Sequence, residues 1–191
     1  AVCIGTDKAV SPLNTYGATK LLMEKLFVSA TNYLNKQKHR TKFVAVRYGN
    51  VLGSSGSILP KFLQQVNEGK KITITDPEMT RFNITMDQAL DLIVRALTKG
   101  TGGEVFVPKL KAYKVGDMKD AIIDLTNSSN QFESIPVRPG EKSHEMLINT
   151  DEIKYTFENE SDYILLQHQK IDQNVIESKN LLKCNLNDQY S

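Results

Sequence analysis

Five polar residues near the start of the chain have the types and spacing for acid–base chemistry. Thr6, Asp7 and Lys8 are consecutive, and Tyr16 and Lys20 follow within one predicted helix. Residues four apart share a helix face, so the phenol and the ammonium are predicted neighbours. A tyrosine ordinarily loses its proton at about pH 10, and a nearby ammonium stabilises the phenolate. Such a group can take a proton from a sugar hydroxyl while a hydride leaves the carbon that bears it.

The spacing of Tyr16 and Lys20 alone is weak, because a helix with one buried tyrosine and a solvated lysine has the same pattern. Thr6 favours the catalytic interpretation, because it ends a predicted strand ten residues before the tyrosine. Asp7 and Lys8 strengthen the case, because ligands of α/β sheets bind at the carboxyl ends of the strands. We therefore interpret these residues as one catalytic group.

The elements that must position this group follow from hydrophobic periodicity and from helix-start and helix-stop signals. The alternation of strands and helices predicts an α/β fold with a largely parallel sheet. Pro12 and Asn14 mark the start of the long helix, and Thr85 is a possible cap of a later one. We expect residues 167–191 to form a loosely attached tail. Strands are predicted at 1–4, 42–48, 72–75, 104–107, 134–137 and 162–166, and helices at 14–34, 58–67, 86–98 and 115–125.

Composition excludes several other classes of protein. The chain has 191 residues, with 24 Lys and Arg against 22 Asp and Glu, and the net charge of +2 does not indicate nucleic acid or an anionic membrane as a partner. No apolar run approaches the roughly 18 residues of a membrane span. The three histidines and two cysteines show no metal-ligand spacing, and two isolated cysteines fit a reducing compartment.

The chain also lacks the glycine-rich signatures of phosphate binding. Its 11 glycines form neither a G-x-G-x-x-G nor a P-loop. It begins inside a predicted buried strand and without a methionine. We therefore expect it to be the C-terminal part of a longer protein, and we expect poor turnover from it alone.

Five ordered segments resemble a known family. They are T-D-K-A-V-S-P-L-N-T-Y-G-A-T-K, R-Y-G-N-V-L-G-S-S-G-S-I-L-P, I-T-D-P-E-M-T-R-F, G-G-E-V-F-V-P-K and R-P-G-E-K-S-H-E, and they span most of residues 1–150. The chain thus resembles the UDP-N-acetylglucosamine 4,6-dehydratases among the extended short-chain dehydrogenase/reductases. Tyr16 in Y-G-A-T-K resembles the C5-inverting enzymes of pseudaminic acid synthesis, because related C5-retaining enzymes often carry Met at this position.

The resemblance implies a fold, a cofactor and roles for individual residues. The fold would be the C-terminal half of a Rossmann-type parallel sheet with a small α/β substrate lobe, over residues 1–150, followed by a partly disordered extension, 151–191. The cofactor would be NADP. Catalytic residues would be Thr6, Asp7, Lys8, Tyr16 and Lys20, with Lys8 as base and Asp7 as acid. Cofactor contacts would be Tyr16, Lys20, Val51, Leu52, Gly53, Ser54 and Ser55. Substrate contacts would be Asn50, Ile58, Thr75, Arg138 and Glu141.

The implied reaction removes water from a UDP-sugar and makes a 4-keto-6-deoxy product for surface polysaccharide or flagellin glycans. The resemblance also implies a cytoplasmic homo-oligomer. Within the same family, C5-retaining dehydration and 4-epimerisation remain alternatives. A catalytically silent, incomplete fragment that binds nucleotide-sugars is another. Adjacent opposite charges on Asp7 and Lys8 oppose the roles of acid and base, so we leave the protonation state of this pair open.

Some positions depart from the family pattern or remain ambiguous. Gly5, Ser55 and Ser143 stand where these enzymes commonly have serine, arginine and an apolar residue. Arg138 and Glu141 could form a local ion pair instead of binding a ligand. A partner carboxylate for Arg81, such as Asp76 or Asp87, is at least as probable as a substrate contact, and His144 is expected to be structural.

Overall fold

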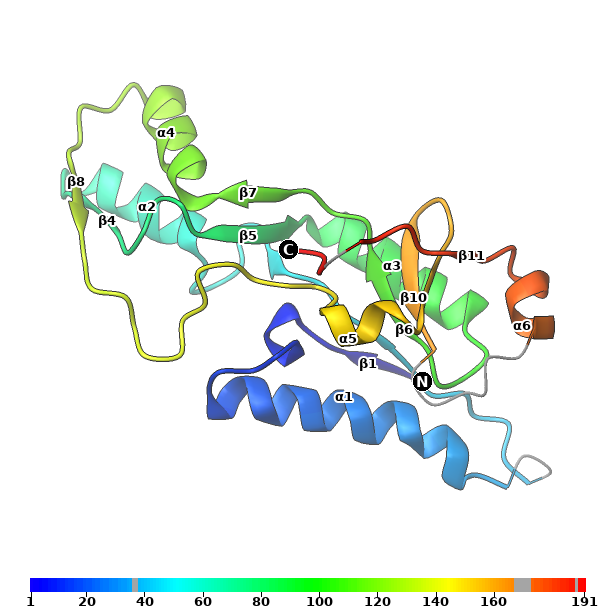
Figure 1. Cartoon of the computed structure of the whole chain (residues 1–191). Coiled ribbons are helices and arrows are strands. Elements are labelled where there is room, and N and C mark those ends of the chain that lie inside the picture. The colour runs from blue at the N-terminus through cyan, green and yellow to red at the C-terminus, as the bar shows by residue number, and fades with distance from the viewer. Residues whose placement is uncertain (36–37, 167–172, 188) are drawn as a thin grey trace.

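A six-stranded sheet forms the body of the molecule. The structure is a computed structural model that describes residues 1–35, 38–166, 173–187 and 189–191. The strand order is β1-β2-β6-β10-β9-β11 (Figure 1). Strands β1, β2 and β6 pair in parallel. Each of β10, β9 and β11 pairs antiparallel with the strand before it in this order. The predicted parallel sheet is thus confirmed for one half of it. The bounds are β1 (Val2–Ile4), β2 (Val44–Val46), β6 (Val105–Pro108), β9 (Thr156–Glu158), β10 (Asp162–Leu165) and β11 (Leu182–Lys183).

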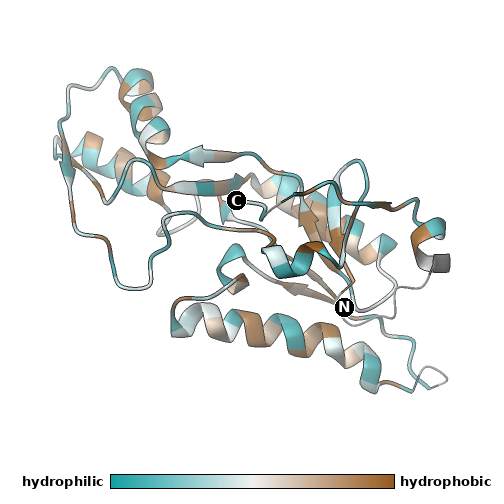
Figure 2. Ribbon diagram, viewed as in Figure 1, coloured by the Kyte–Doolittle hydropathy of each residue, from teal (hydrophilic) through white to brown (hydrophobic). Residues whose placement is uncertain are grey.

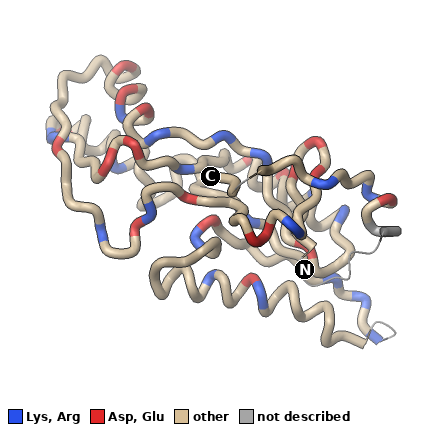
Figure 3. Tube along the Cα trace, in the orientation of Figure 1, with Lys and Arg blue, Asp and Glu red and all other residues tan. Residues whose placement is uncertain are grey.

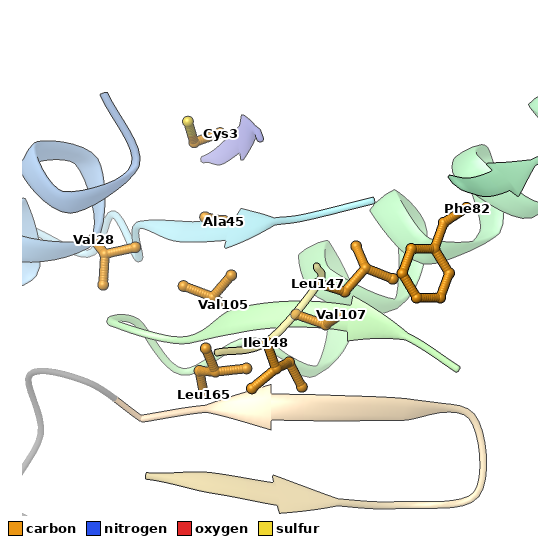
Figure 4. Packing of buried hydrophobic residues seen from close by; sticks show 9 residues of the cluster. All are labelled: Cys3, Val28, Ala45, Phe82, Val105, Val107, Leu147, Ile148 and Leu165. Atoms are coloured by element: carbon orange, nitrogen blue, oxygen red, sulfur yellow. The ribbon is translucent and has the colours of Figure 1, made fainter. Parts of the chain in front are cut away.

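Two helices cover opposite faces of the parallel strands. Successive side chains of a strand point to opposite faces, so each strand contributes to two separate clusters. Val28 of α1 (Thr15–Tyr33) belongs to one cluster, with Ala45 and Val105 of the sheet (Figure 4). Leu92 of α3 (Met86–Lys99) belongs to the other, with neighbouring strand residues such as Val46. Because both faces are buried, these strands are apolar almost throughout, as Figure 2 shows.

Both long helices begin where the sequence predicts. The side chain of Asn14 caps α1, and its Oδ1 accepts a hydrogen bond from the backbone N–H of Gly17 at 2.9 Å. Thr85 caps α3 and forms a reciprocal capping box with Gln88. Such caps satisfy backbone N–H groups that lack a partner in the first turn.

A smaller lobe lies beyond one end of the main sheet, at the upper left of Figure 1. Its apolar core includes Phe62, Met79 and Ile122, which are supplied by helices α2 and α4 and by the turn before β5. In one sheet β3, β5 and β7 are neighbours, and in another β4 pairs with β8. The bounds are α2 (Ile58–Asn67), α4 (Val115–Thr126), β3 (Asn50–Val51), β4 (Ile72–Ile74), β5 (Thr80–Ile84), β7 (Ala112–Lys114) and β8 (Phe132–Ser134).

The prediction of a loosely attached tail is wrong for the described residues after 172. This region contains α6 (Gln173–Ser178) and β11, which pairs with β9. The ring of Tyr190 packs against Phe82, with centroids 5.2 Å apart, and Lys179 forms an ion pair with the buried Glu104. The tail is polar in sequence, but a few apolar residues and one ion pair are enough to fix it. Residues 167–172 lie outside the described residues.

A buried ion network joins three elements that lie far apart in the sequence. Arg47 follows β2 and is fully buried, as is Glu24 of α1. Arg47 Nη2 lies 2.6 Å from Glu24 Oε1, and its Nη1 lies 2.8 Å from Oε2 of Glu152 in α5 (Thr150–Ile153). Arg47 Nη1 also donates to the carbonyl of Leu147 at 2.9 Å. Buried charges need such complete pairing because transfer from water is costly.

Gly5 lies beside this network and leaves no room for a side chain. A Cβ at this position would lie 2.6 Å from the carbonyl oxygen of Val46 and 3.5 Å from Glu24 Oε2. The departure from the family pattern at Gly5 therefore suits the close approach of β1 and β2 in this chain.

We predict that Arg47→Met lowers the free energy of unfolding by about 3–5 kcal/mol, because it leaves two buried carboxylates without their cation. Urea denaturation measures this loss. Lys114→Met is the matched control, since Lys114 forms an exposed ion pair with Glu78 and the solvent screens that pair, so its loss should change the unfolding free energy far less. Equal losses in the two variants would contradict a structural role for the network.

The same network predicts how stability depends on pH. Burial raises the pKa of Glu152, but the charge of Arg47 and the hydrogen bonds from Arg47 outweigh burial, and the net pKa is below its ordinary value. A carboxyl with a lowered folded-state pKa stabilises the protein above its unfolded pKa, and this contribution is lost as the pH falls through the folded value. We expect the unfolding free energy to fall below about pH 4.3. Glu152→Gln should flatten this fall in urea titrations, and an unchanged slope would contradict the assignment.

Candidate active site

The turn after β1 brings the first three predicted catalytic residues together. Residues Asp7–Ala9 form a short 3-10 helix, η1, with Thr6 as its N-cap. Thr6 Oγ1 donates a hydrogen bond of 2.8 Å to Asp7 Oδ1, and Lys8 Nζ donates one of 2.8 Å to the same oxygen. Asp7 is fully buried, and its Oδ2 has no hydrogen-bond partner among the described residues. One carboxylate oxygen thus receives two donors, and the other remains free for a further partner.

Asn50 lies against this turn and completes the group. Its Oδ1 accepts a hydrogen bond of 3.1 Å from Lys8 Nζ. Asn50 is placed by β3, where it is the register partner of Asn83 on β5. The preceding Gly49 makes this crossing possible, because a Cβ there would lie 2.3 Å from the carbonyl oxygen of Phe82.

Tyr16 and Lys20 lie at the start of α1, beside the same turn. Gly17 lets the helix approach η1, since a Cβ at this position would lie 2.6 Å from the carbonyl oxygen of Lys8. The Tyr16 side chain is 57% exposed, and Lys20 Nζ lies 5.5 Å from the centroid of its ring. The phenol and the ammonium are therefore neighbours, as the spacing of the two residues predicts, and the phenol is open to a ligand.

A cavity of about 440 Å³ connects this group to the segment between β8 and α5. Lys8, Tyr16 and Asn50 line one side of it, and Arg138 and Glu141 line the other. In Figure 1 this segment is yellow and returns past the N-terminal end of α1. Catalytic and substrate-contact candidates that are more than 80 residues apart in the sequence thus share one cavity.

The remaining predicted substrate contacts lie next to this cavity. Ile58 and Thr75 line an adjoining cavity of about 220 Å³, which shares Asn50, Arg138 and Glu141 with the first. The predicted cofactor segment Val51–Ser55 lines neither of the two. It follows Asn50 on the outside of the molecule, and Leu52 within it is 43% exposed.

The structure corrects the expected partner of Arg81. Neither Asp76 nor Asp87 pairs with it. Its Nη2 lies 3.4 Å from Oε1 of Glu141, and its Nη1 donates to the carbonyl of Ser143 at 3.1 Å. Asp76 instead accepts a hydrogen bond from the backbone of its own turn. The sequence could not reveal the true partner, because it lies 60 residues away on a returning loop.

Arg138 and Glu141 do not form a side-chain ion pair. Glu141 Oε2 accepts a 3.3 Å hydrogen bond from the backbone N–H of Arg138, whereas the guanidinium of Arg138 has no hydrogen-bond or ion-pair partner among the residues that the structure describes. An exposed guanidinium at the mouth of a cavity is suited to a phosphate by its fork geometry. His144 has the structural role that the sequence predicts, since its Nδ1 lies 3.0 Å from Thr80 Oγ1.

Three charged residues of the cavity are not among the site residues predicted from the sequence. Arg81, Lys142 and Glu145 all line the wall and are at least about nine-tenths buried. With Lys8, Arg138 and Glu141 they give the cavity four cationic and two anionic side chains. This excess of positive charge favours an anionic ligand. Over the molecule as a whole, charges of both signs are interspersed (Figure 3).

Other features of the described part of the chain do not compete with this site. A larger cavity of about 990 Å³ lies near Phe106, Ile164 and Lys179 and holds none of the predicted site residues. In the described ranges there is no cluster of three potential metal ligands, and no helix is long and apolar enough to cross a membrane. Cys3 and Cys184 are both free thiols.

Comparison with known proteins places the chain in a family. Residues 1–168 match the family model described as "Polysaccharide biosynthesis protein". The chain belongs to this family. Among curated proteins of similar sequence, it is 42% identical over 166 residues to the UDP-N-acetylglucosamine 4,6-dehydratase (inverting) of Campylobacter jejuni. The matched residues cover 86% of the chain and 48% of that protein. The chain is 44% identical over 156 residues to the capsular polysaccharide biosynthesis protein CapD of Staphylococcus aureus, covering 80% and 25%.

Solved structures confirm the Rossmann-type fold of the chain. Pen from Bacillus thuringiensis superposes with a TM-score of 0.80 at 39% identity, over 86% of the chain and 52% of that structure. The UDP-glucose 4-epimerase of Thermus thermophilus, solved with NAD, gives 0.62 at 18% identity, over 76% and 54%. At that identity the likeness concerns the fold alone. The chain spans about half the length of the Campylobacter relative and of both solved structures. It spans a quarter of the length of CapD.

We predict that Gly49→Ala destabilises the protein by about 1–3 kcal/mol, because the new methyl group would collide with the backbone of β5. Thermal unfolding measures the loss. Gly69→Ala is the control: the space around Gly69 is open, and only its positive φ of 64° opposes a side chain, at about 1 kcal/mol. If Gly49→Ala unfolds at the wild-type temperature, the close approach of Asn50 to β5 is not as described.

Proposed function

We propose that this chain carries the substrate side of an NADP-dependent 4,6-dehydration of UDP-N-acetylglucosamine with inversion at C5. The observation that carries the proposal is the contact of Lys8 with both Asp7 and Asn50 on a cavity wall shared with Tyr16 and Arg138. The 42% identity to the Campylobacter enzyme supports this choice of substrate. The product would be a 4-keto-6-deoxy sugar nucleotide for surface polysaccharide or, through pseudaminic acid, for flagellin glycans.

The residues present fit a nicotinamide cofactor beside Tyr16. The exposed phenol of Tyr16 and the half-buried ammonium of Lys20 supply donors, and the segment Val51–Ser55 adjoins Asn50 on the cavity wall. When bound, such a cofactor takes up a hydride from the sugar and returns one, so that there is no net redox change. Tyr16 would receive the proton of the sugar O4, and Lys20 would stabilise the resulting phenolate.

Asp7 and Lys8 would carry out the elimination across C5 and C6. A ketone at C4 acidifies the hydrogen on C5, so the step needs a base at C5 and an acid at O6. The contact of 2.8 Å allows the proton of Lys8 Nζ to pass to Asp7, which gives a neutral amine and a protonated carboxyl. Lys8 then takes the C5 proton, and Asp7 protonates the leaving O6.

Thr6 and the substrate contacts have supporting roles in this scheme. The hydroxyl of Thr6 donates to Asp7 Oδ1, so it orients the acid and leaves Oδ2 without a hydrogen bond. Arg138 would bind the diphosphate and Glu141 the ribose, with Asn50 on the sugar. Ile58 and Thr75 would extend the contact into the adjoining cavity.

A 4-epimerase is the second candidate, because the UDP-glucose 4-epimerase of Rickettsia rickettsii is 38% identical over 152 residues. Epimerisation needs only the proton transfer at O4, which Tyr16 alone can provide. It gives no role to an acid and a base beside C5 and C6. The Asp7–Lys8 pair therefore favours dehydration, and the C5 configuration of the product distinguishes inverting from retaining chemistry.

Exchange of the C5 hydrogen tests the base directly and does not depend on the cofactor. UDP-linked 4-keto-6-deoxy-N-acetylhexosamine already has the acidifying ketone, so in D2O the protein should speed the loss of its C5 proton signal. We predict that Lys8→Met slows this exchange by roughly 10²–10⁴-fold, the usual contribution of a general base. Proton NMR of the sugar gives the rate.

Lys70→Met is the matched control, because Lys70 lines neither of the two cavities and pairs with Glu68 on the surface, so its loss should leave the exchange rate within about twofold of the wild type. Exchange at the wild-type rate in Lys8→Met would remove Lys8 from the mechanism. Absence of exchange in the wild-type protein would count against dehydration as the function.

A further inference from the structure

Glu145 is a buried carboxylate without a hydrogen bond. It is 7% exposed, and no described residue donates a hydrogen bond to either of its oxygens. It nevertheless lines the same cavity as Lys8, Tyr16 and Arg138. The other carboxylate of this cavity, Glu141, is satisfied by Arg81 and by the backbone of Arg138. Buried carboxylate oxygens normally accept hydrogen bonds, so Glu145 Oε2 has an acceptor position for which no described residue supplies a donor.

Lys142 fixes the place of this carboxylate. Its Nζ lies 3.7 Å from Glu145 Oε2, too far for a hydrogen bond but close enough for an ion pair. The same Nζ donates to the carbonyl oxygen of Val10, directly after the η1 turn that carries Asp7 and Lys8. The backbone N–H of Glu145 also donates to the carbonyl of Thr80 at 3.3 Å. Glu145 is therefore held on the cavity wall from two sides.

The surroundings restrict what can bind there. A metal ion is disfavoured, because the neighbouring ammonium of Lys142 repels cations and no group of three potential ligands exists among the described residues. A phosphate is disfavoured by the negative charge of Glu145 itself. A neutral O–H or N–H donor satisfies the carboxylate without bringing another charge into the cavity.

We propose that Glu145, positioned by Lys142, accepts a hydrogen bond from a hydroxyl or amide group of the bound nucleotide-sugar and thereby determines specificity. This inference rests on the function proposed above, since it assumes that a UDP-sugar enters the cavity. It makes Glu145 a recognition residue in addition to Arg138 and Glu141. The donor belongs either to the hexose or to the ribose, and both present hydroxyl groups.

Isothermal titration calorimetry with UDP and with UDP-N-acetylglucosamine tests the proposal on the wild-type chain and on Glu145→Gln. Glu145→Gln keeps a neutral acceptor but removes the charge that strengthens the hydrogen bond, so binding should weaken roughly 10-fold. Weaker binding of UDP-N-acetylglucosamine alone assigns the donor to the hexose, and equal weakening of both ligands assigns it to the ribose. Glu133→Gln is the control, because Glu133 is exposed on β8 and its substitution removes the same charge at a position away from the cavity.

Unchanged affinity for both ligands in Glu145→Gln, with a wild-type protein that binds them, would overturn the role of Glu145 and leave the proposed function intact. A wild-type protein that binds neither ligand would overturn both. Glu145→Asp keeps the charge and withdraws the carboxylate by one methylene. It should reproduce the loss of affinity with a near-wild-type melting temperature, and so separates recognition from a failure of Glu145→Gln to fold.

Discussion

The buried pairing of Arg47 with Glu24 and Glu152 is the constraint on which the site depends. Each of its three elements continues directly into part of the cavity. Arg47 follows β2 and leads to Asn50, the helix with Glu24 carries Tyr16 in its first turn, and Glu152 follows the returning segment with Arg138. Because a buried ion network tolerates little change in geometry, it fixes the relative positions of residues that do not contact each other.

Thr6, Asp7 and Lys8 are in direct hydrogen-bond contact with one another at the site. Two donors converge on one oxygen of the fully buried Asp7, while its other oxygen stays free. Lys8 in turn connects Asp7 to Asn50, because its Nζ donates hydrogen bonds to both side chains. The neighbouring cations of the cavity favour an anionic ligand beside this group.

The sequence predicted those parts of the fold that have strong local signals. Asn14 and Thr85 cap the helices that they were expected to cap, and the buried strands appear as apolar runs. Strands β3, β5 and β7 were missed because they are two to five residues long and mix polar with apolar side chains. The expected partner of Arg81 was wrong, and Glu145 was not singled out as a site residue, because both depend on a loop that returns from a distant part of the chain.

The most direct measurement of the central claim is an amide chemical-shift map of the labelled protein titrated with UDP-N-acetylglucosamine. If one ligand joins the η1 turn to the returning loop, the largest changes should fall together on Asp7, Lys8, Asn50, Tyr16 and Arg138. Changes confined to the separate cavity near Phe106 and Lys179 would contradict the account. Changes confined to the η1 turn alone, or to the returning loop alone, would also contradict it.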